Sequence, residues 1–328
     1  MTAVQDIWHE AAGVWADRTA DLRSTFSAPV TCDPRMVTKA PCLASAPGGV
    51  GPGAWARAFG EWSHNDGTAI VDPPAGALGK AHSSDVSYHQ NIFRVQAGMD
   101  FAAQRMGYEN FVFGVLVGAV NSKVDFVSGT NVKLDGGNLG AYATYLNHNF
   151  FTDALFMANI LNVHYNQSAL LNSAGTAVSF GGHIDMGYRF NFQQNWFAEP
   201  LGTIEAVYTD FSNVNLPGVG VNLNNEHARG RLGLRVGTSF VNGGYRIEPS
   251  LTGSIWHSFT DDNIAELTSG AYAIDLTDVN THRTYGEIGG AVNIFEMGSR
   301  WSAFAKGDFR FATDYTAGSG KIGFRYNW

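Results

Sequence analysis

Charged residues are scarce in this sequence, and long apolar runs are missing from it. Only 15% of the 328 residues are charged, whereas 45% are hydrophobic, 13% are aromatic and 39 are glycine. Because soluble proteins carry about 25% charged residues, this composition disfavours intrinsic disorder and long surface helices and favours β-sheet. The longest apolar run, residues 111–120, is half the length of a membrane-spanning helix. Any membrane crossing must therefore be made by β-strands.

Basic residues are outnumbered by acidic ones, 21 to 29, which gives a formal net charge of -8. Binding to the phosphates of nucleic acid needs a basic stripe, and this sequence has none. Nucleic acid is therefore excluded as the main partner.

The sequence has only two cysteines, Cys32 and Cys42, and both lie in a proline-rich segment. Neither belongs to a CxxC motif or to a cluster with zinc spacing, so we expect no metal site and no cofactor. We expect the pair to form a local disulfide in an oxidising compartment, and free thiols are the alternative. The chain starts with MTAVQDIW, without the basic and apolar segments of a signal peptide, so for an exported protein we expect this sequence to be a mature fragment.

Residues 3–25 have the periodicity of a helix. Apolar residues recur there at a spacing of three to four among charged ones, namely Val4, Ile7, Trp8, Ala11, Trp15 and Leu22. A helix of this length is roughly 35 Å long, close to the bilayer's hydrocarbon thickness of about 30 Å. The following segment contains too many prolines and glycines for regular structure. We therefore divide the chain into a helix (1–25), a linker with the cysteine pair (26–53) and a third region (54–328).

From residue 54 to the end, apolar and polar residues alternate with a period of two, as in half-buried β-strands. The alternation is clearest in residues 93–101, 184–192 and 228–237. The same template predicts about twelve strands. They lie near residues 54–63, 87–103, 109–124, 137–148, 151–166, 177–193, 196–210, 227–241, 244–258, 282–295, 300–312 and 318–328.

The connections alternate between short ones, such as residues 194–195, and mostly longer polar ones, such as residues 64–86, 212–226 and 259–281. Tight turns at one end and long loops at the other are typical of outer-membrane barrels, whose turns are periplasmic and whose loops lie outside. A soluble sandwich or lipocalin-like barrel also alternates, but with so little charge it would expose too large an apolar patch. We therefore predict an all-β fold, a transmembrane antiparallel up-and-down β-barrel in the bacterial outer membrane with one N-terminal helix.

The expected lumen has room for one helix. Twelve strands about 4.8 Å apart and tilted by about 40° leave a bore of about 12–14 Å, and a helix is about 10–12 Å wide. We therefore expect the helix to plug the lumen, and a position on the membrane surface or in a separate helical domain is the alternative.

Charged residues on the polar phase of the strands should face this lumen, because a charge on the lipid face costs about 2–4 kcal/mol at mid-membrane. They are Arg57, Glu61, Arg94, Asp100, Asp185, Arg189, Arg229, Arg231, Arg235, Glu248, Glu287, Lys306, Asp308, Arg310 and Arg325. These residues could form a salt-bridge lattice that fills the barrel, or hold the polar face of the helix, or do both. The polar face consists of Asp17, Arg18, Asp21 and Arg23.

Three segments carry a family resemblance, GAWARAFGEW (Gly53–Trp62), RGRLGLRVG (Arg229–Gly237) and KIGFRYNW (Lys321–Trp328). With the order helix, linker and strands, the chain resembles the C-terminal translocator domain of classical monomeric autotransporters, the type Va secretion family. The resemblance implies a barrel that the outer-membrane assembly machinery inserts into outer-membrane lipid. It also implies an N-terminal passenger that the barrel exports and anchors at the cell surface, with the helix left in the pore. The alternating aromatics Phe324, Tyr326 and Trp328 then correspond to a C-terminal assembly signal that faces lipid.

Two other functions compete with export. A small outer-membrane pore or adhesin would use the long loops, and a barrel hydrolase would use a Ser/His site. The pairs His257–Ser258, with Asp261 and Asp262 nearby, and His82–Ser83 lack a strand-turn-helix context and an oxyanion element, so we expect no enzyme and no catalytic residues. His164 and His183 are interpreted as ordinary residues of the barrel rim.

Overall fold

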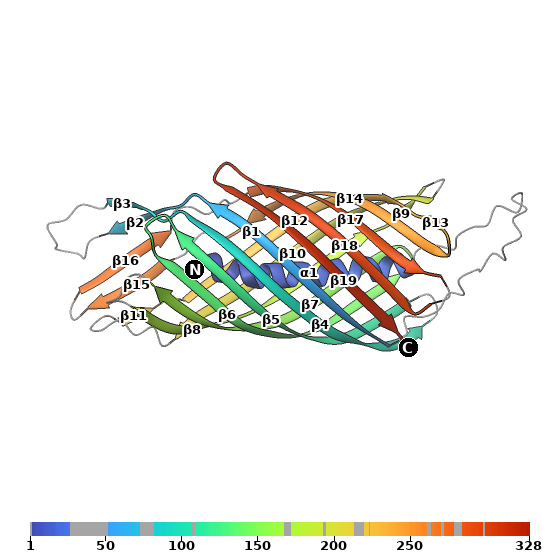
Figure 1. Cartoon of the computed structure of the whole chain (residues 1–328), viewed down its shortest axis with the longest axis horizontal. Helices are drawn as coiled ribbons and strands as arrows, with labels where there is room; N and C mark the ends of the chain where they lie inside the picture. Colours follow the sequence, from blue (N-terminus) through green and yellow to red (C-terminus); the bar gives the residue numbers. More distant parts are fainter. Residues whose placement is uncertain are drawn as a thin grey trace, which may run out of the picture.

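In the computed structural model, the chain forms a β-barrel with a helix inside it (Figure 1). The structure describes residues 2–26, 52–72, 82–106, 109–166, 172–192, 195–212, 220–222, 224–260, 264–269, 272–278, 284–297 and 299–328. Cys32, Cys42 and most of the expected linker lie outside the described residues.

Within the described residues, twelve long strands form the barrel wall, and each pairs antiparallel with the next one along the chain. They are β1 (Gly53–Asn65), β4 (Tyr88–Met106), β5 (Glu109–Phe126), β6 (Asn131–Asn147), β7 (Phe150–Asn166), β8 (Asn172–Tyr188), β10 (Trp196–Ser212), β12 (Asn224–Thr238), β14 (Tyr245–Ser258), β17 (Thr284–Glu296), β18 (Trp301–Phe311) and β19 (Tyr315–Asn327). The short strands β9 (Phe190–Asn191) and β13 (Phe240–Asn242) extend the wall beside β10 and β14. Pairing of β1 with β19, from Gly53 opposite Asn327 to Asn65 opposite Tyr315, closes the sheet. The prediction of a closed up-and-down barrel is confirmed.

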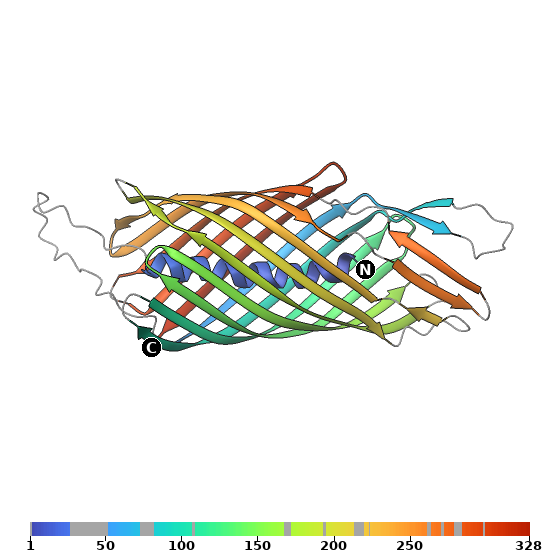
Figure 2. The ribbon, with the colours of Figure 1, turned by 180° about the vertical axis from the view of Figure 1, so that it is seen from behind.

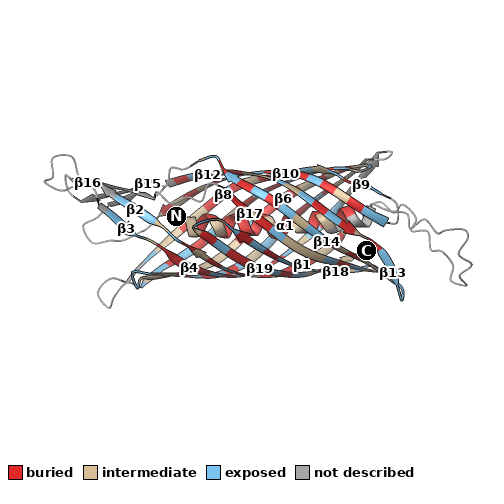
Figure 3. Ribbon diagram, turned by 90° about the horizontal axis from the view of Figure 1, so that it is seen from above, coloured by how far each residue is buried: buried red, intermediate tan, exposed pale blue. Residues whose placement is uncertain are grey.

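Side chains alternate between the inside and the outside of this wall because successive residues of a strand point to opposite faces. In β1, for example, Trp55, Arg57 and Phe59 are buried, whereas Trp62 is 61% exposed. Figure 3 shows the same alternation of buried and exposed residues along the strands. The exposed phase carries large apolar side chains such as Phe156 and is the face that meets lipid.

Helix α1 (Thr2–Phe26) runs along the barrel axis, and two opposite views show it enclosed by the strands of the wall (Figures 1 and 2). The C-terminus of the chain lies at one end of the barrel, and the N-terminus of the helix points toward the other end (Figure 1). The helix is therefore in the lumen, as expected from the sequence. No helix in the described residues is both long and apolar enough to cross a membrane.

A second, five-stranded sheet extends from the barrel end opposite the C-terminus (Figure 1). In spatial order it contains β11 (Gly220–Asn222), β15 (Ile264–Ser269), β16 (Tyr272–Asp278), β2 (Thr68–Asp72) and β3 (His82–Asp85). The interpretation of residues 64–86, 212–226 and 259–281 as loops was therefore wrong in part. These strands come from three separate connections and pair through their main chains. Their sequences lack the long apolar alternation from which the other strands were predicted.

The tight turn between β13 and β14 depends on glycine. Gly243 and Gly244 have φ angles of 57° and 87°, which suit a two-residue hairpin turn with both central residues at positive φ. Side chains other than Asn and Asp rarely adopt this conformation, so the Gly-Gly pair fixes the turn.

Four other glycines form a row across the outer face of the barrel. Gly60, Gly320, Gly307 and Gly290 lie directly opposite one another on β1, β19, β18 and β17. A Cβ atom added at Gly60 or Gly320 would meet no atom within 4 Å, so this glycine row leaves a shallow gap among the lipid-facing side chains.

Candidate functional site in the barrel lumen

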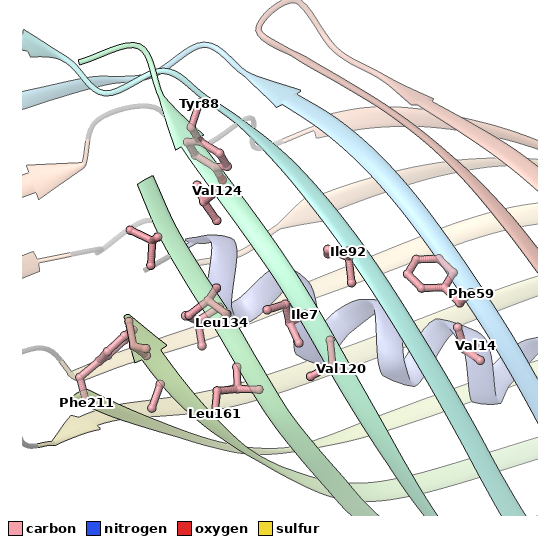
Figure 4. Packing of buried hydrophobic residues seen from close by; sticks show 14 residues of the cluster. Ile7, Val14, Phe59, Tyr88, Ile92, Val120, Val124, Leu134, Leu161 and Phe211 are labelled. Carbon is pink, nitrogen blue, oxygen red and sulfur yellow. The ribbon is translucent and has the colours of Figure 1, made fainter. Parts of the chain in front are cut away.

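One side of α1 packs on an apolar part of the barrel wall. The helix contacts β6, β7, β8 and β10, and Trp8 and Trp15 are completely buried there. The indole nitrogen of Trp8 donates a hydrogen bond to the carbonyl of Met157 at 3.0 Å. Near the N-terminal half of the helix, Ile7 and Val14 face inward-pointing apolar residues of the wall, as Figure 4 shows. The tryptophans therefore fit the lumen, because they belong to one buried apolar cluster with wall residues such as Leu155 and Val207.

The inner face of β5 is apolar rather than charged. Inward-facing Val112, Leu116 and Val120 of β5 are buried, while Phe113 and Val117 on the other phase are exposed to lipid. Both faces of such a strand are apolar, so the alternation that marks the inside elsewhere is absent.

Ion pairs also hold the helix, and the most buried of them is centred on Asp100. This carboxylate of β4 accepts hydrogen bonds from Arg18 of the helix and from Tyr142 Oη at 2.7 Å, and its other oxygen lies 3.2 Å from Arg325 Nη2. The Arg18 guanidinium also lies over the Tyr142 ring, 4.6 Å from its centroid. Arg18 and Asp100 are both fully buried, so this cluster fixes the helix in depth and rotation.

Three further helix residues form ion pairs with the wall. Asp17 accepts a hydrogen bond from Lys306 Nζ at 2.9 Å, and its other oxygen lies 3.3 Å from Lys321 Nζ. Arg23 Nη1 lies 3.1 Å from Asp153 Oδ2. Arg310 contacts both Glu10 of the helix and Glu61 of β1. The side chain of Asp21, which the sequence placed on the polar face, is not among the described ones.

Histidines form another contact between helix and wall. His9 Nδ1 lies 2.6 Å from Glu205 Oε2, and the other oxygen of this carboxylate lies 2.8 Å from His183 Nδ1. Arg229 Nε also donates to Glu205, at 2.6 Å, and His9 Nε2 lies 2.8 Å from His227 Nδ1. Glu205 thus joins three strands to the helix.

Other ion pairs connect wall residues to one another. Arg189 and Arg235 each contact both Glu199 and Glu248, at 3.1–3.2 Å, so four side chains form a closed ring. Arg231 Nη2 lies 3.3 Å from Asp185 Oδ1. All four members of this ring belong to the wall.

All fifteen charged residues selected from the strand phase point into the interior. Thirteen are buried, and Arg231 and Lys306 are partly exposed at 13% and 11% of their side chains. They divide into residues that contact the helix, such as Lys306 and Arg310, and residues that contact other wall strands, such as Arg189 and Glu248.

Several site residues were missed by the sequence reasoning, namely Glu10, Asp153, Glu199, Glu205, Lys321, His9 and His183. His183 is buried beside Glu205, so its interpretation as a rim residue was wrong. His164 is half exposed, 3.8 Å from Asp135. The alternation along β10 could have identified Glu199 and Glu205, because the residues that alternate with them, such as Ile204, are apolar and face outward.

The Ser/His pairs considered for a hydrolase do not assemble. Ser258 Oγ lies 3.2 Å from His227 Nε2, whereas its neighbour His257 bonds Thr284. Asp261, Asp262 and the side chain of His82 lie outside the described residues. Among the described side chains, no group of three or more His, Cys, Asp or Glu residues is arranged to hold a metal ion.

Replacing Asp100 with alanine is expected to lower the thermal stability of the barrel strongly. The change leaves Arg18 and Arg325 buried without this carboxylate, and breaking a buried ion pair costs about 3–5 kcal/mol. The matched control is Asp125→Ala, which removes an exposed pair with Lys123 and should cost at most about 1 kcal/mol. Heat-modifiable gel mobility of the purified barrels in detergent measures both. Equal midpoints for the two variants would contradict the buried role of Asp100.

Comparisons with known proteins give a consistent result. The family model described as autotransporter beta-domain matches residues 54–308. The autotransporter adhesin/invasin TibA of Escherichia coli O78:H11 is 28% identical over 144 residues, which are 41% of this chain and 14% of TibA. The chain therefore spans a small part of that relative.

Two of the similar solved structures cover nearly the whole barrel. The beta domain of the Bordetella autotransporter BrkA has a TM-score of 0.63 at 18% identity, over 85% of this chain and 100% of that one. The translocator domain of NalP from Neisseria meningitidis has a TM-score of 0.62 at 14% identity, over 100% and 99% of the two chains. At these identities, the likeness shows a shared fold.

Proposed function

The chain belongs to the autotransporter β-domain family, and from this premise we propose that it exports a polypeptide joined to its N-terminus and then anchors it. The barrel is an outer-membrane protein, and its lipid-facing residues form the apolar band that this location requires. In this proposal residues 1–25 are the pore plug, 26–53 the linker and 54–328 the membrane anchor.

The direction of the helix carries the proposal. The N-terminus of α1 points to the barrel end where the longer connections and the five-stranded sheet lie, and the C-terminus of the chain lies at the other end (Figure 1). In outer-membrane barrels the long connections are outside and the short turns are periplasmic. A passenger joined to the N-terminus of the helix would therefore be on the cell surface, with the helix as its tether.

The ion pairs of the lumen give the tether its strength in this proposal. Arg18, Asp17 and Arg23 hold the helix to three parts of the wall, and Glu10 adds a fourth through Arg310. A pull on an attached passenger would have to separate these buried charges, which is costly in a low-dielectric interior.

We further propose that the outer-membrane assembly machinery recognises the last strand. Phe324 and Trp328 are 53% and 48% exposed on the outer face, with Tyr326 between them, and Arg325 on the other face forms an ion pair with Asp100. Trp301 of β18 packs on Tyr326 with ring centroids 4.7 Å apart. The three aromatics thus remain on the lipid side, available to a partner before the barrel closes.

The export function is tested with one epitope tag placed at either end of the barrel. A tag before Thr2 should be cut by protease added to intact cells, because the helix N-terminus points outward. The same tag inserted between Gly243 and Gly244, in a tight turn of the opposite end, is the control and should be protected. Protection of the N-terminal tag in cells whose barrel is inserted would contradict the proposal.

The competing interpretation as a small pore is not favoured, because the helix occupies the lumen and its large side chains are buried on the wall.

The kind of passenger is a further part of the proposed export function. TibA is named an adhesin and invasin, and we propose that this chain likewise anchors a surface protein.

A further inference from the structure

Four side chains of the wall donate hydrogen bonds to main-chain carbonyls of the helix. The pairs are Gln90 Nε2 to Ala3 O (2.9 Å), Arg94 Nη2 to Ile7 O (2.7 Å), Gln96 Nε2 to Ala11 O (3.4 Å) and Arg57 Nη1 to Val14 O (3.0 Å). The acceptors are three or four residues apart, so they lie on one side of the helix. The donors all come from the neighbouring strands β1 and β4. We call Gln90, Arg94, Gln96 and Arg57 the carbonyl ladder.

The carbonyl ladder differs in kind from the ion pairs of the lumen. Arg18 with Asp100, or Arg310 with Glu10, requires particular side chains on the helix. A main-chain carbonyl is present in every residue, so the ladder contacts nothing that is specific to the helix sequence. Its four donors are also buried, with at most 5% of each residue exposed.

Arg94 gives the clearest indication that the carbonyl ladder does more than stabilise the wall. Among the side chains that the structure describes, no carboxylate lies within ion-pair distance of it, although only 1% of the residue is exposed. Its Nε and Nη1 atoms are buried without a hydrogen-bond partner, as are the amide oxygens of Gln90 and Gln96. Burying a guanidinium without a carboxylate is costly, and a wall built only for stability would pair it.

We propose that the carbonyl ladder is a sequence-independent binding site for polypeptide main chain. It binds the carbonyls of the passenger during transit and those of α1 afterwards. The proposal rests on the export function and names the chemical group that the barrel recognises in its substrate.

The chemistry of the donors suits a moving chain. A polypeptide in a narrow pore loses water from its carbonyls, and each unbonded carbonyl is costly there. A guanidinium has five N–H donors, so Arg94 can bond an incoming carbonyl through a free nitrogen before it releases the outgoing one. The two glutamine amides extend the same donor line along β4.

The test measures export of two passengers of unrelated sequence, one a Gly/Ser repeat and one rich in Glu and Thr, each fused before Thr2 of the full chain. The barrel carries Gln90→Met with Gln96→Met, or Arg94→Met, which remove donors at similar volume. The matched control is Asn138→Leu, since Asn138 is a buried lumen amide that donates to Met157 Sδ and not to the helix. Pulse labelling followed by protease on intact cells gives the rate of surface exposure, and heat-modifiable mobility gives the amount of inserted barrel.

For the ladder variants we expect surface exposure per inserted barrel to slow by about fivefold or more, because each net hydrogen bond that is lost changes a rate by roughly that factor. The factor should be the same for both passengers, and Asn138→Leu should export at the native rate. An unchanged rate overturns the proposal, and so does slowing of one passenger alone, since that means side-chain recognition. Where the combined variant does not insert, Gln90→Met alone decides by the same criteria. A native barrel that exports neither passenger overturns the export function itself.

Discussion

Deleting residues 2–25 is expected to raise the single-channel conductance of the barrel several-fold in planar lipid bilayers. The helix fills the lumen, because Trp8, Trp15 and Leu22 are all fully buried between helix and wall. A cavity of about 70 Å³ lies beside the helix, lined by residues such as Lys306 and Arg231. That volume holds only a few water molecules, whereas the empty bore of about 12–14 Å would conduct freely.

The matched control for the deletion is Gly13→Ala. A Cβ atom at Gly13 would meet no atom within 4 Å, so this change leaves the helix in place. Its methyl group extends into the remaining cavity, and conductance should stay at the native value or fall slightly. A deletion variant with the same conductance as the native barrel would contradict the plugging role of the helix.

Replacing Trp328 with glutamine is expected to reduce the amount of inserted barrel in cells several-fold, with a much smaller change in the melting temperature of the barrel that does insert. The main-chain nitrogen of Trp328 donates to Pro52 O at 3.0 Å, a bond that the substitution keeps. The ring is 48% exposed, so its packing contributes little to the folded barrel. Its larger contribution would be to recognition of the last strand before closure.

The control is Trp301→Gln. Trp301 is 50% exposed and contacts the same aromatic cluster, but it belongs to β18 and not to the terminal strand. The two variants should therefore melt at similar temperatures and differ in yield. Heat-modifiable mobility of membrane fractions gives the yield, and thermal melts of purified protein give the stability. Equal losses of yield in both would indicate that the aromatics only supply burial against lipid.

The barrel could be predicted from the sequence because its physical cause is local. Each strand crosses from one membrane surface to the other, so the period of two persists through residues 184–192 and 228–237. The five-stranded sheet could not be predicted in this way. Strand β3 reads His-Ser-Ser-Asp, with no apolar face, and it exists through main-chain pairing with β2.

The sequence was enough to predict which charged residues face the lumen, but not which residues they pair with. The alternation of residues along the strands assigned Asp100 and Arg310 to the lumen, because a charge on the lipid face is too costly. Their partners depend on how deep the helix lies and how it is rotated, and Arg310 and Glu10 are 300 residues apart in the chain. The carbonyl ladder was invisible for a further reason, since its acceptors are main-chain atoms that no residue type marks.

The glycine row has a consequence for where the barrel is weakest. A glycine in a strand loses more conformational entropy on ordering than alanine does, which costs roughly 0.5–1 kcal/mol at each position. Gly60 and Gly320 face each other across β1 and β19, and Gly307 continues the row on β18. The penalty is therefore concentrated at the junction of the first and last strands, where the sheet closes on itself. Local opening of the wall should begin there, while the strands around the apolar half, from β4 to β8, stay paired.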